Sequence, residues 1–215
     1  MANVIETLKT VREDVGVNVY DDCMPPDTYT KLLRVSQPVG WRFGWNTPSN
    51  PGARYWHHEV GYGNKQNLES VSDRVRQHPA KIFATYMDWL LEQLPRSIKI
   101  LRFYLNARTF GTDGWPHIDT DRQGERTGIL YLNDKWQPAW GGETAIFNAR
   151  GDVTDAVLPR RNRLLVFPSD ALHAPRPLTR AYTGLRAPGA DSRGPGFPYP
   201  RVYRVAGGVG GKDWL

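Results

Sequence analysis

The chain has 215 residues, of which 40% are hydrophobic and 23% are charged, and its net charge is +6 with the histidines neutral. These values are typical of a soluble globular protein with one domain-sized core, and no run of about 18 apolar residues exists that would predict a transmembrane helix. The single cysteine, Cys23, excludes an internal disulfide framework and a cysteine-based zinc site.

The charge pattern and the N-terminus bear on location and partners. The first residues lack the apolar core of a secretory signal and include acidic side chains, so we expect a cytoplasmic protein with no membrane partner. The positive charge is spread along the chain, and "PRRNR" (159–163) is one short basic cluster. A basic balance can serve a nucleic-acid partner, but this even spread favours an ordinary surface, so nucleic acid is kept only as an alternative.

The first half of the chain predicts helices between short extended pieces. Alternating valines predict a strand over residues 15–22, and "PPDTYTKLLRVS" (25–36) predicts a helix that begins at its prolines. Residues 40–64 are rich in aromatic and turn residues and predict loop with short strand pieces. The clearest helix is predicted over 79–95, where apolar residues recur at intervals of three and four between two prolines.

After residue 97 the hydrophobic period changes from that of a helix to that of a strand. The strand-like runs are "SIKILRFYLNA", "RTGILYLND", "GGETAIFNA", "AVLPRRNRLLVFPS" and "RVYRVAGG", separated by turn residues, whereas residues 187–200 predict a loop rich in Pro and Gly. This order predicts an α+β, mainly β fold around a jelly-roll-like barrel. We expect a single domain over 1–215, with a helical N-terminal support over about 1–97 and a barrel core over about 98–206.

The stretch "GWPHIDTD" (114–121) carries the first candidate site. If it is a strand, His117 and Asp119 project from the same face, because residues two apart in a strand share a side. A 2-His-1-carboxylate iron site needs one more histidine. His173 follows the apolar run "RLLVFPSDAL" and suits two strands that meet across a small barrel, whereas the other three histidines lie upstream.

The motifs in series are more specific than H-x-D alone. H-x-D followed by "LYLN", "WGGET" and "NRLLVFPSDALH" resembles the Fe(II)/2-oxoglutarate-dependent dioxygenase superfamily, in particular its prolyl-4-hydroxylase-like group, over about residues 98–206. The resemblance implies a double-stranded β-helix, or cupin-like, core in which His117, Asp119 and His173 are the catalytic Fe(II) ligands. It also implies 2-oxoglutarate as co-substrate and O2 as oxidant, with ascorbate as an optional addition.

The co-substrate needs a cation for its C5-carboxylate, and an arginine suits it best because it can pair through two hydrogen bonds. In the family this residue begins the strand after the second histidine, about ten residues on, where this chain has Tyr182 and Thr183. Arg201, at the start of "RVYRVAGG", is the first candidate, and Arg204 lies three residues further on. Arg186 is the second candidate, because the Pro and Gly residues that follow it interrupt a strand.

Other aromatic residues are candidates for contacts in the site. By resemblance, Tyr131 and Tyr104 would hydrogen-bond the co-substrate, although they are equally well explained as residues that fill the barrel. Trp115, beside the H-x-D motif, and His57, in "WHHEV", are candidates for contact with the primary substrate. His57 and Glu59 would share a strand face, but "WHHEV" offers no third ligand for a second metal.

The expected activity is hydroxylation of an unactivated C–H bond, with release of succinate and CO2. The substrate would be a small molecule or an amino-acid or peptidyl group. Family members that halogenate have a small residue at the position of Asp119, so its carboxylate favours hydroxylation, desaturation or a related oxidation. An AlkB-type nucleic-acid demethylase and a non-catalytic barrel that binds metal or ligand remain as alternatives. The sequence specifies neither the primary substrate nor the oligomeric state.

Overall fold

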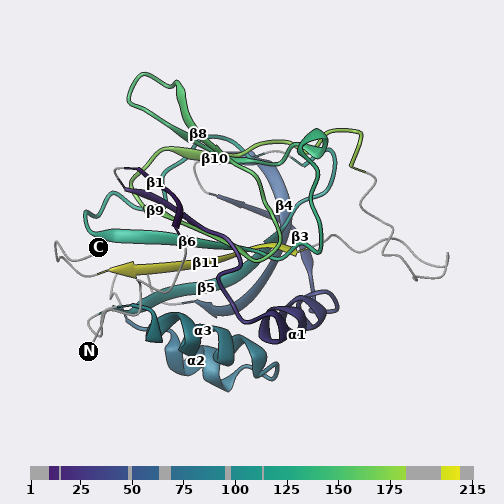
Figure 1. The fold of residues 1–215 in the computed structure, drawn as a ribbon, viewed down its shortest axis with the longest axis vertical. Coiled ribbons are helices and arrows are strands. Elements are labelled where there is room, and N and C mark those ends of the chain that lie inside the picture. Colours follow the sequence, from purple (N-terminus) through teal and green to yellow (C-terminus); the bar gives the residue numbers. More distant parts are fainter. Residues whose placement is uncertain are drawn as a thin grey trace.

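The mainly β fold with flanking helices is confirmed by the computed structural model (Figure 1). The structure describes residues 10–14, 16–47, 50–62, 69–94, 98–112, 114–182 and 200–208. Its helices are α1 (Pro26–Ser36), α2 (Ser72–Gln77), α3 (Ile82–Glu92) and one turn of 3-10 helix (Pro138–Trp140). Its strands are β1 (Thr10–Asp14), β2 (Val17–Tyr20), β3 (Arg42–Thr47), β4 (Asn50–Tyr62), β5 (Ile100–Ala107), β6 (Glu125–Tyr131), β7 (Thr144–Phe147), β8 (Val153–Val157), β9 (Arg163–Pro168), β10 (His173–Pro175) and β11 (Pro200–Gly208).

The strands form a large sheet and a small one. The large sheet has the order β1-β2-β9-β6-β11-β5-β4-β3, and the small sheet has the order β10-β7-β8, with antiparallel pairing in both. In Figure 1 the three helices cover one side of the large sheet, and β8 and β10 lie on its other side. The large sheet is therefore a layer between the helices and the small sheet, with a different set of side chains on each face.

Side-chain alternation divides the core into two parts. On β5, Phe103 and Leu105 pack with the helices, and on β6 Leu130 does the same. Ile129 and Tyr131 of β6 belong to the second cluster, which contains residues of β2, β7, β8 and β9. Because successive residues of a strand face opposite sides, the hydrophobic runs of these central strands serve two cores at once.

The helix side of the sheet is anchored by large buried rings. The first helix begins at Pro26, a favourable first position because proline lacks an N–H that would need a partner there. From its first turn, the fully buried Tyr29 donates its hydroxyl hydrogen to the backbone carbonyls of Tyr131 (3.1 Å) and Asn133 (2.8 Å). Phe83 of α3 packs on Phe103 of β5, and each such buried ring stabilises the fold by roughly 1.5–3 kcal/mol.

The prediction of loop with short strand pieces over residues 40–64 is wrong in its loop part, because two strands, β3 and the 13-residue β4, pair as a hairpin over most of this stretch. The turn residues in this stretch indicated loop, but β4 forms a strand through its antiparallel pairing with β5, which the local sequence does not show. At Gly61 a Cβ would lie 2.8 Å from a methyl group of Val75, so the glycine allows α2 to approach the strand rather than marking a turn.

Other predicted elements differ in smaller ways. The helix predicted over 79–95 is confirmed as the shorter α3, whereas α2, β1 and β10 have no counterpart in the sequence prediction. The segment before residue 98 contributes β1 to β4 as well as three helices. This segment therefore contains more β-structure than the helical support that we expected there. None of the helices in the described part of the chain is long and apolar enough to cross a membrane.

Candidate metal centre

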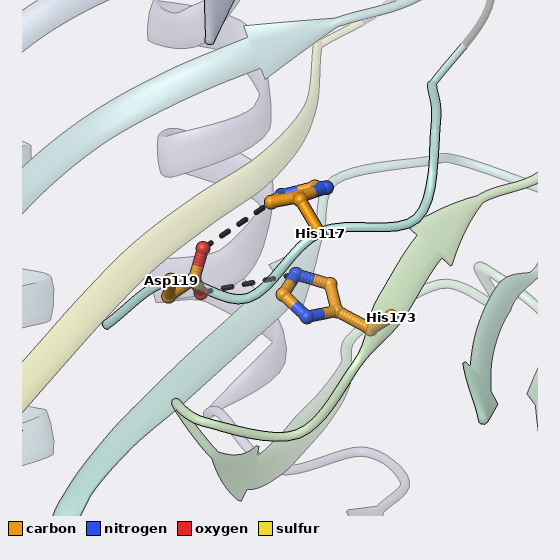
Figure 2. Close-up of side chains that lie close together, drawn as sticks. All are labelled: His117, Asp119 and His173. Atoms are coloured by element: carbon orange, nitrogen blue, oxygen red, sulfur yellow. Dashed lines mark ion pairs between the residues drawn. The ribbon is translucent and has the colours of Figure 1, made fainter. Parts of the chain in front are cut away.

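Three side chains converge between the two sheets. His117, Asp119 and His173 each offer one ligand atom, and these atoms all lie within 4.8 Å of one another (Figure 2). His117 and Asp119 come from the segment between β5 and β6, and His173 is the first residue of β10. Among the described residues this is the group of three or more His, Cys, Asp or Glu side chains arranged to hold a metal ion.

The backbone brings the two histidines together. His117 N–H donates to the His173 carbonyl (2.9 Å) and His173 N–H donates to the His117 carbonyl (3.0 Å), which makes an isolated antiparallel bridge. Asp119 N–H donates to the Ser169 carbonyl at 2.8 Å. The expected strand over the H-x-D motif is thus reduced to one bridge, but its extended backbone still directs both side chains to one point.

Each histidine is oriented by a hydrogen bond at Nδ1. Nδ1 of His117 donates to the carbonyl of Trp115 and Nδ1 of His173 donates to the carbonyl of Ala171, both at 2.9 Å. A carbonyl only accepts, so in each ring Nδ1 carries a proton, and in the neutral ring the lone pair is on Nε2. Such a hydrogen bond at the far nitrogen is what orients metal-binding histidines.

The spacing of the ligand atoms fits one shared ion. The Nε2 atom of His117 lies 3.7 Å from Oδ1 of Asp119, and the Nε2 atom of His173 lies 3.8 Å from its Oδ2. These distances are too long for hydrogen bonds. Ligand atoms that bind one ion at about 2.1 Å are roughly 3–4 Å apart, so the observed separations are those expected of atoms that bind the same metal ion.

Hydroxyl groups hold the carboxylate. The Asp119 side chain is only 1% exposed, and its Oδ2 accepts a 2.6 Å hydrogen bond from Oγ1 of Thr127 on β6. Since the Thr127 hydrogen is used in this bond, the Ser169 hydroxyl, 2.9 Å away, donates to Thr127 in turn. The sequence prediction missed Thr127 and Ser169, because nothing in "RTGIL" or "FPSD" distinguishes their hydroxyls from ordinary turn or strand residues.

Burial sets the protonation state of the second histidine. It lowers the pKa of His173 from its ordinary value of 6.5 to about 4, and only the hydrogen bond to Ala171 opposes this effect. His173 is therefore neutral at pH 7, the state in which an imidazole binds a metal. Two neutral imidazoles and one carboxylate would offset one charge of a divalent cation.

The two candidate tyrosines lie on the same side of the large sheet, with different partners. Tyr131 is buried, and its hydroxyl donates to Oγ1 of Thr144 on β7 at 2.6 Å, so it links the two sheets. Tyr104 is buried on β5 and its ring packs 5.2 Å from that of His57.

The candidate substrate residues occupy different environments. Trp115 is 57% exposed, and its backbone carbonyl orients His117. His57 lies on β4, buried and paired in register with Asn106 of β5. The two residues therefore offer an exposed apolar surface and a buried polar group, respectively.

The two candidate arginines, Arg186 and Arg201, come from the C-terminal part of the chain. Arg186 lies outside the described residues. Arg201 lies in β11, at the point where the pairing with β5 shifts register between Pro200 and Val202. The regular part of β11 pairs position 204 with Tyr104 on one side and with Ile129 on the other.

A family match covers the segment that contains this site. Residues 103–186 match the family model of the 2OG-Fe(II) oxygenase superfamily, which confirms the resemblance drawn from the motifs. No curated protein matches the sequence.

Solved structures share the fold at low sequence identity. A Pseudomonas putida prolyl-4-hydroxylase is 19% identical with a TM-score of 0.54, over 89% of this chain and 91% of that one. A Trichoplax adhaerens prolyl hydroxylase, in complex with a hypoxia inducible factor peptide fragment, is 17% identical with a TM-score of 0.54, over 95% and 86%. HygX from Streptomyces hygroscopicus, with nickel, 2-oxoglutarate and hygromycin B bound, is 12% identical with a TM-score of 0.52, over 89% and 81%.

Proposed function

We propose that His117, Asp119 and His173 are the Fe(II) ligands of an enzyme of the 2OG-Fe(II) oxygenase superfamily, whose family model matches residues 103–186. The family match carries the enzyme class, an oxidoreductase that uses Fe(II), 2-oxoglutarate and O2. The observation that supports these three residues is their geometry. Two Nε2 lone pairs and a buried carboxylate, each oriented by a hydrogen bond, converge within 4.8 Å.

The proposed reaction is hydroxylation of a C–H bond in a small-molecule, amino-acid or peptidyl substrate. The chemistry that the bound ion supplies is activation of O2, coupled to oxidative decarboxylation of 2-oxoglutarate to succinate and CO2. The protein's own residues orient both Nε2 atoms, keep the His173 imidazole neutral and hold the Asp119 carboxylate next to a hydroxyl donor. We also propose that the two facing sheets form a double-stranded β-helix.

For the co-substrate we propose an arginine of β11, assisted by Tyr131 and Tyr104. In the strand register, position 204 pairs with Ile129 of β6. Ile129 is two residues from Thr127, which donates to Asp119. This pairing supports Arg204 as a candidate beside Arg201. Arg201→Gln and Arg204→Gln therefore form a matched pair, and we expect one of them to raise the half-saturating 2-oxoglutarate concentration at least tenfold.

Succinate formation from 2-oxoglutarate tests the proposal. The wild-type chain with Fe(II) should form succinate, whereas His117→Ala and Asp119→Ala should lose both Fe(II) binding and succinate formation. Asp121→Ala, two residues away at an exposed position, is the matched control and should retain both. Undiminished Fe(II) binding by His117→Ala would contradict the proposed ligand set, and metal binding without turnover in the wild type would favour a non-catalytic barrel.

A further inference from the structure

His57 carries one of several buried side-chain polar atoms in the described residues that have no hydrogen-bond partner and lie outside the metal centre. His57 is only 4% exposed, and its Nε2 atom has no hydrogen-bond partner. Its other ring nitrogen, Nδ1, lies 2.7 Å from Oδ1 of Asn106. An amide oxygen only accepts, so Nδ1 carries the proton and Nε2 presents a lone pair. A buried acceptor without a donor costs free energy unless a ligand or water supplies one.

The ring of His57 is fixed in place by aromatic neighbours. Trp45 of β3 stacks on it with ring centroids 4.0 Å apart and an angle of 11° between the planes. Tyr104 packs at 5.2 Å on β5, and Tyr62 contacts both Trp45 and Tyr104. Trp45 remains 40% exposed, so this aromatic wall continues from the buried acceptor to the protein surface.

The strand register places the acceptor on the same face of the large sheet as the metal centre. His57 pairs with Asn106, which is two residues from Tyr104 on β5. Through β11, Tyr104 is in register with Ile129, which is two residues from Thr127, the hydrogen-bond donor to Asp119. Residues two apart on a strand and cross-strand partners share a face. His57 and Asp119 are therefore both on the side turned away from the helices.

We propose that His57 is a specificity-determining residue whose Nε2 accepts a hydrogen bond from an N–H or O–H group of the primary substrate, with a planar part of that substrate against Trp45. This inference rests on the proposed function. Asn106 acts as a positioning residue, because its amide oxygen holds the proton of His57 on Nδ1.

The same chemistry excludes a class of substrate group. Burial lowers the pKa of His57, so its ring is neutral at pH 7, and its hydrogen bond to the amide oxygen of Asn106 only partly opposes this shift. An ionised carboxylate has no proton to donate to Nε2, and its charge is repelled by the lone pair. The group recognised at His57 is thus a neutral or cationic hydrogen-bond donor.

Three small probes test the site in the full chain labelled with ¹⁵N. Benzamide offers a flat ring and an N–H donor, N,N-dimethylbenzamide keeps the ring but lacks the donor, and benzoate has only acceptors. We expect Nε2 of free His57 to be unprotonated, and benzamide to shift both this resonance and the Trp45 indole resonance. The other two probes should bind at least tenfold more weakly. Equal binding of all three, no shift with benzamide, or a protonated Nε2 would overturn the inference.

Variants separate the hydrogen bond from the packing. His57→Phe keeps a ring against Trp45 but removes the acceptor, and it should weaken benzamide binding about tenfold, the loss expected for one hydrogen bond to a buried group. His57→Gln restores a side-chain acceptor and should recover most of the affinity. Wild-type benzamide affinity in a folded His57→Phe protein would overturn the proposed role, and thermal melting checks the fold of each variant.

The test also distinguishes failure of this inference from failure of the proposed function. Co(II) titration reports on the metal centre independently of the probes. His117→Ala should lose Co(II) binding yet retain the benzamide shift, because His57 is on β4, which lies between β5 and β3 in the sheet, and His117 is on a different segment. Normal Co(II) binding without a benzamide shift contradicts the recognition site alone, whereas a benzamide shift without Co(II) binding contradicts the metal centre alone.

Discussion

Replacing Thr127 by valine should weaken metal binding without disturbing the three candidate ligands. The change removes the hydroxyl that donates to Oδ2 of Asp119 at 2.6 Å and leaves Ser169 without its 2.9 Å partner, while it preserves a branched side chain of similar size. A hydrogen bond to a charged group contributes about 1.5–3 kcal/mol, and loss of such a partner weakens metal affinity by roughly 10–100-fold. We therefore expect Fe(II) affinity to fall within that range.

The assay is equilibrium titration with Fe(II) under anaerobic conditions. Thr127→Ser keeps the hydroxyl and should bind the metal within about threefold of the wild type. Thr154→Val is a matched control, because Thr154 also has its hydroxyl on a strand but donates to the backbone of Ile146, away from Asp119. If folded Thr127→Val bound Fe(II) as tightly as the wild type, the hydroxyl would have no part in holding the carboxylate, and the reasoning would be refuted.

Three further predictions concern stability. Asp21→Ala should lower the free energy of unfolding by about 2 kcal/mol in urea titrations, since it removes both carboxylate acceptors of the buried Arg163 guanidinium and leaves it only the carbonyl of Leu158; equal stability would show that water replaces the pair. Gly114→Ala should cost about 1–3 kcal/mol, because its Cβ would overlap the ring of Pro175, and an unchanged melting temperature would contradict this close packing. Burial lowers the pKa of His58 below its unfolded value of 6.5, so the unfolded chain binds more protons and stability should fall as pH decreases below 6.5. His58→Phe should reduce this pH dependence in melting experiments, and an identical slope would count against it.

The candidate site was predictable from the sequence because its chemistry is carried by residue types that are rare in this chain. With five histidines in 215 residues, the H-x-D motif and His173 left few combinations for a 2-His-1-carboxylate site. The alternation of His117 and Asp119 is a local property of an extended backbone. The supporting hydroxyls were not predictable, because the contact of Thr127 with Asp119 depends on which residue of β6 lies opposite the motif after folding.

The sequence by itself determined that residues 26–36 and 82–92 are helix-forming, that the runs after residue 97 are strand-forming, and which side chains can bind a metal. The hydrophobic period and the metal-binding chemistry of a side chain are local properties, so both can be recognised from the sequence alone. Only the tertiary structure decided that β3 and β4 form a hairpin, that His117 and His173 bridge each other, and that position 204 pairs with Ile129. Each of these depends on pairing between distant strands, which no local pattern specifies. In the sequence, His57 is one residue of an aromatic-rich stretch. The same strand pairing makes it a buried acceptor on the sheet face of the metal centre, with its Nδ1 proton held by Asn106.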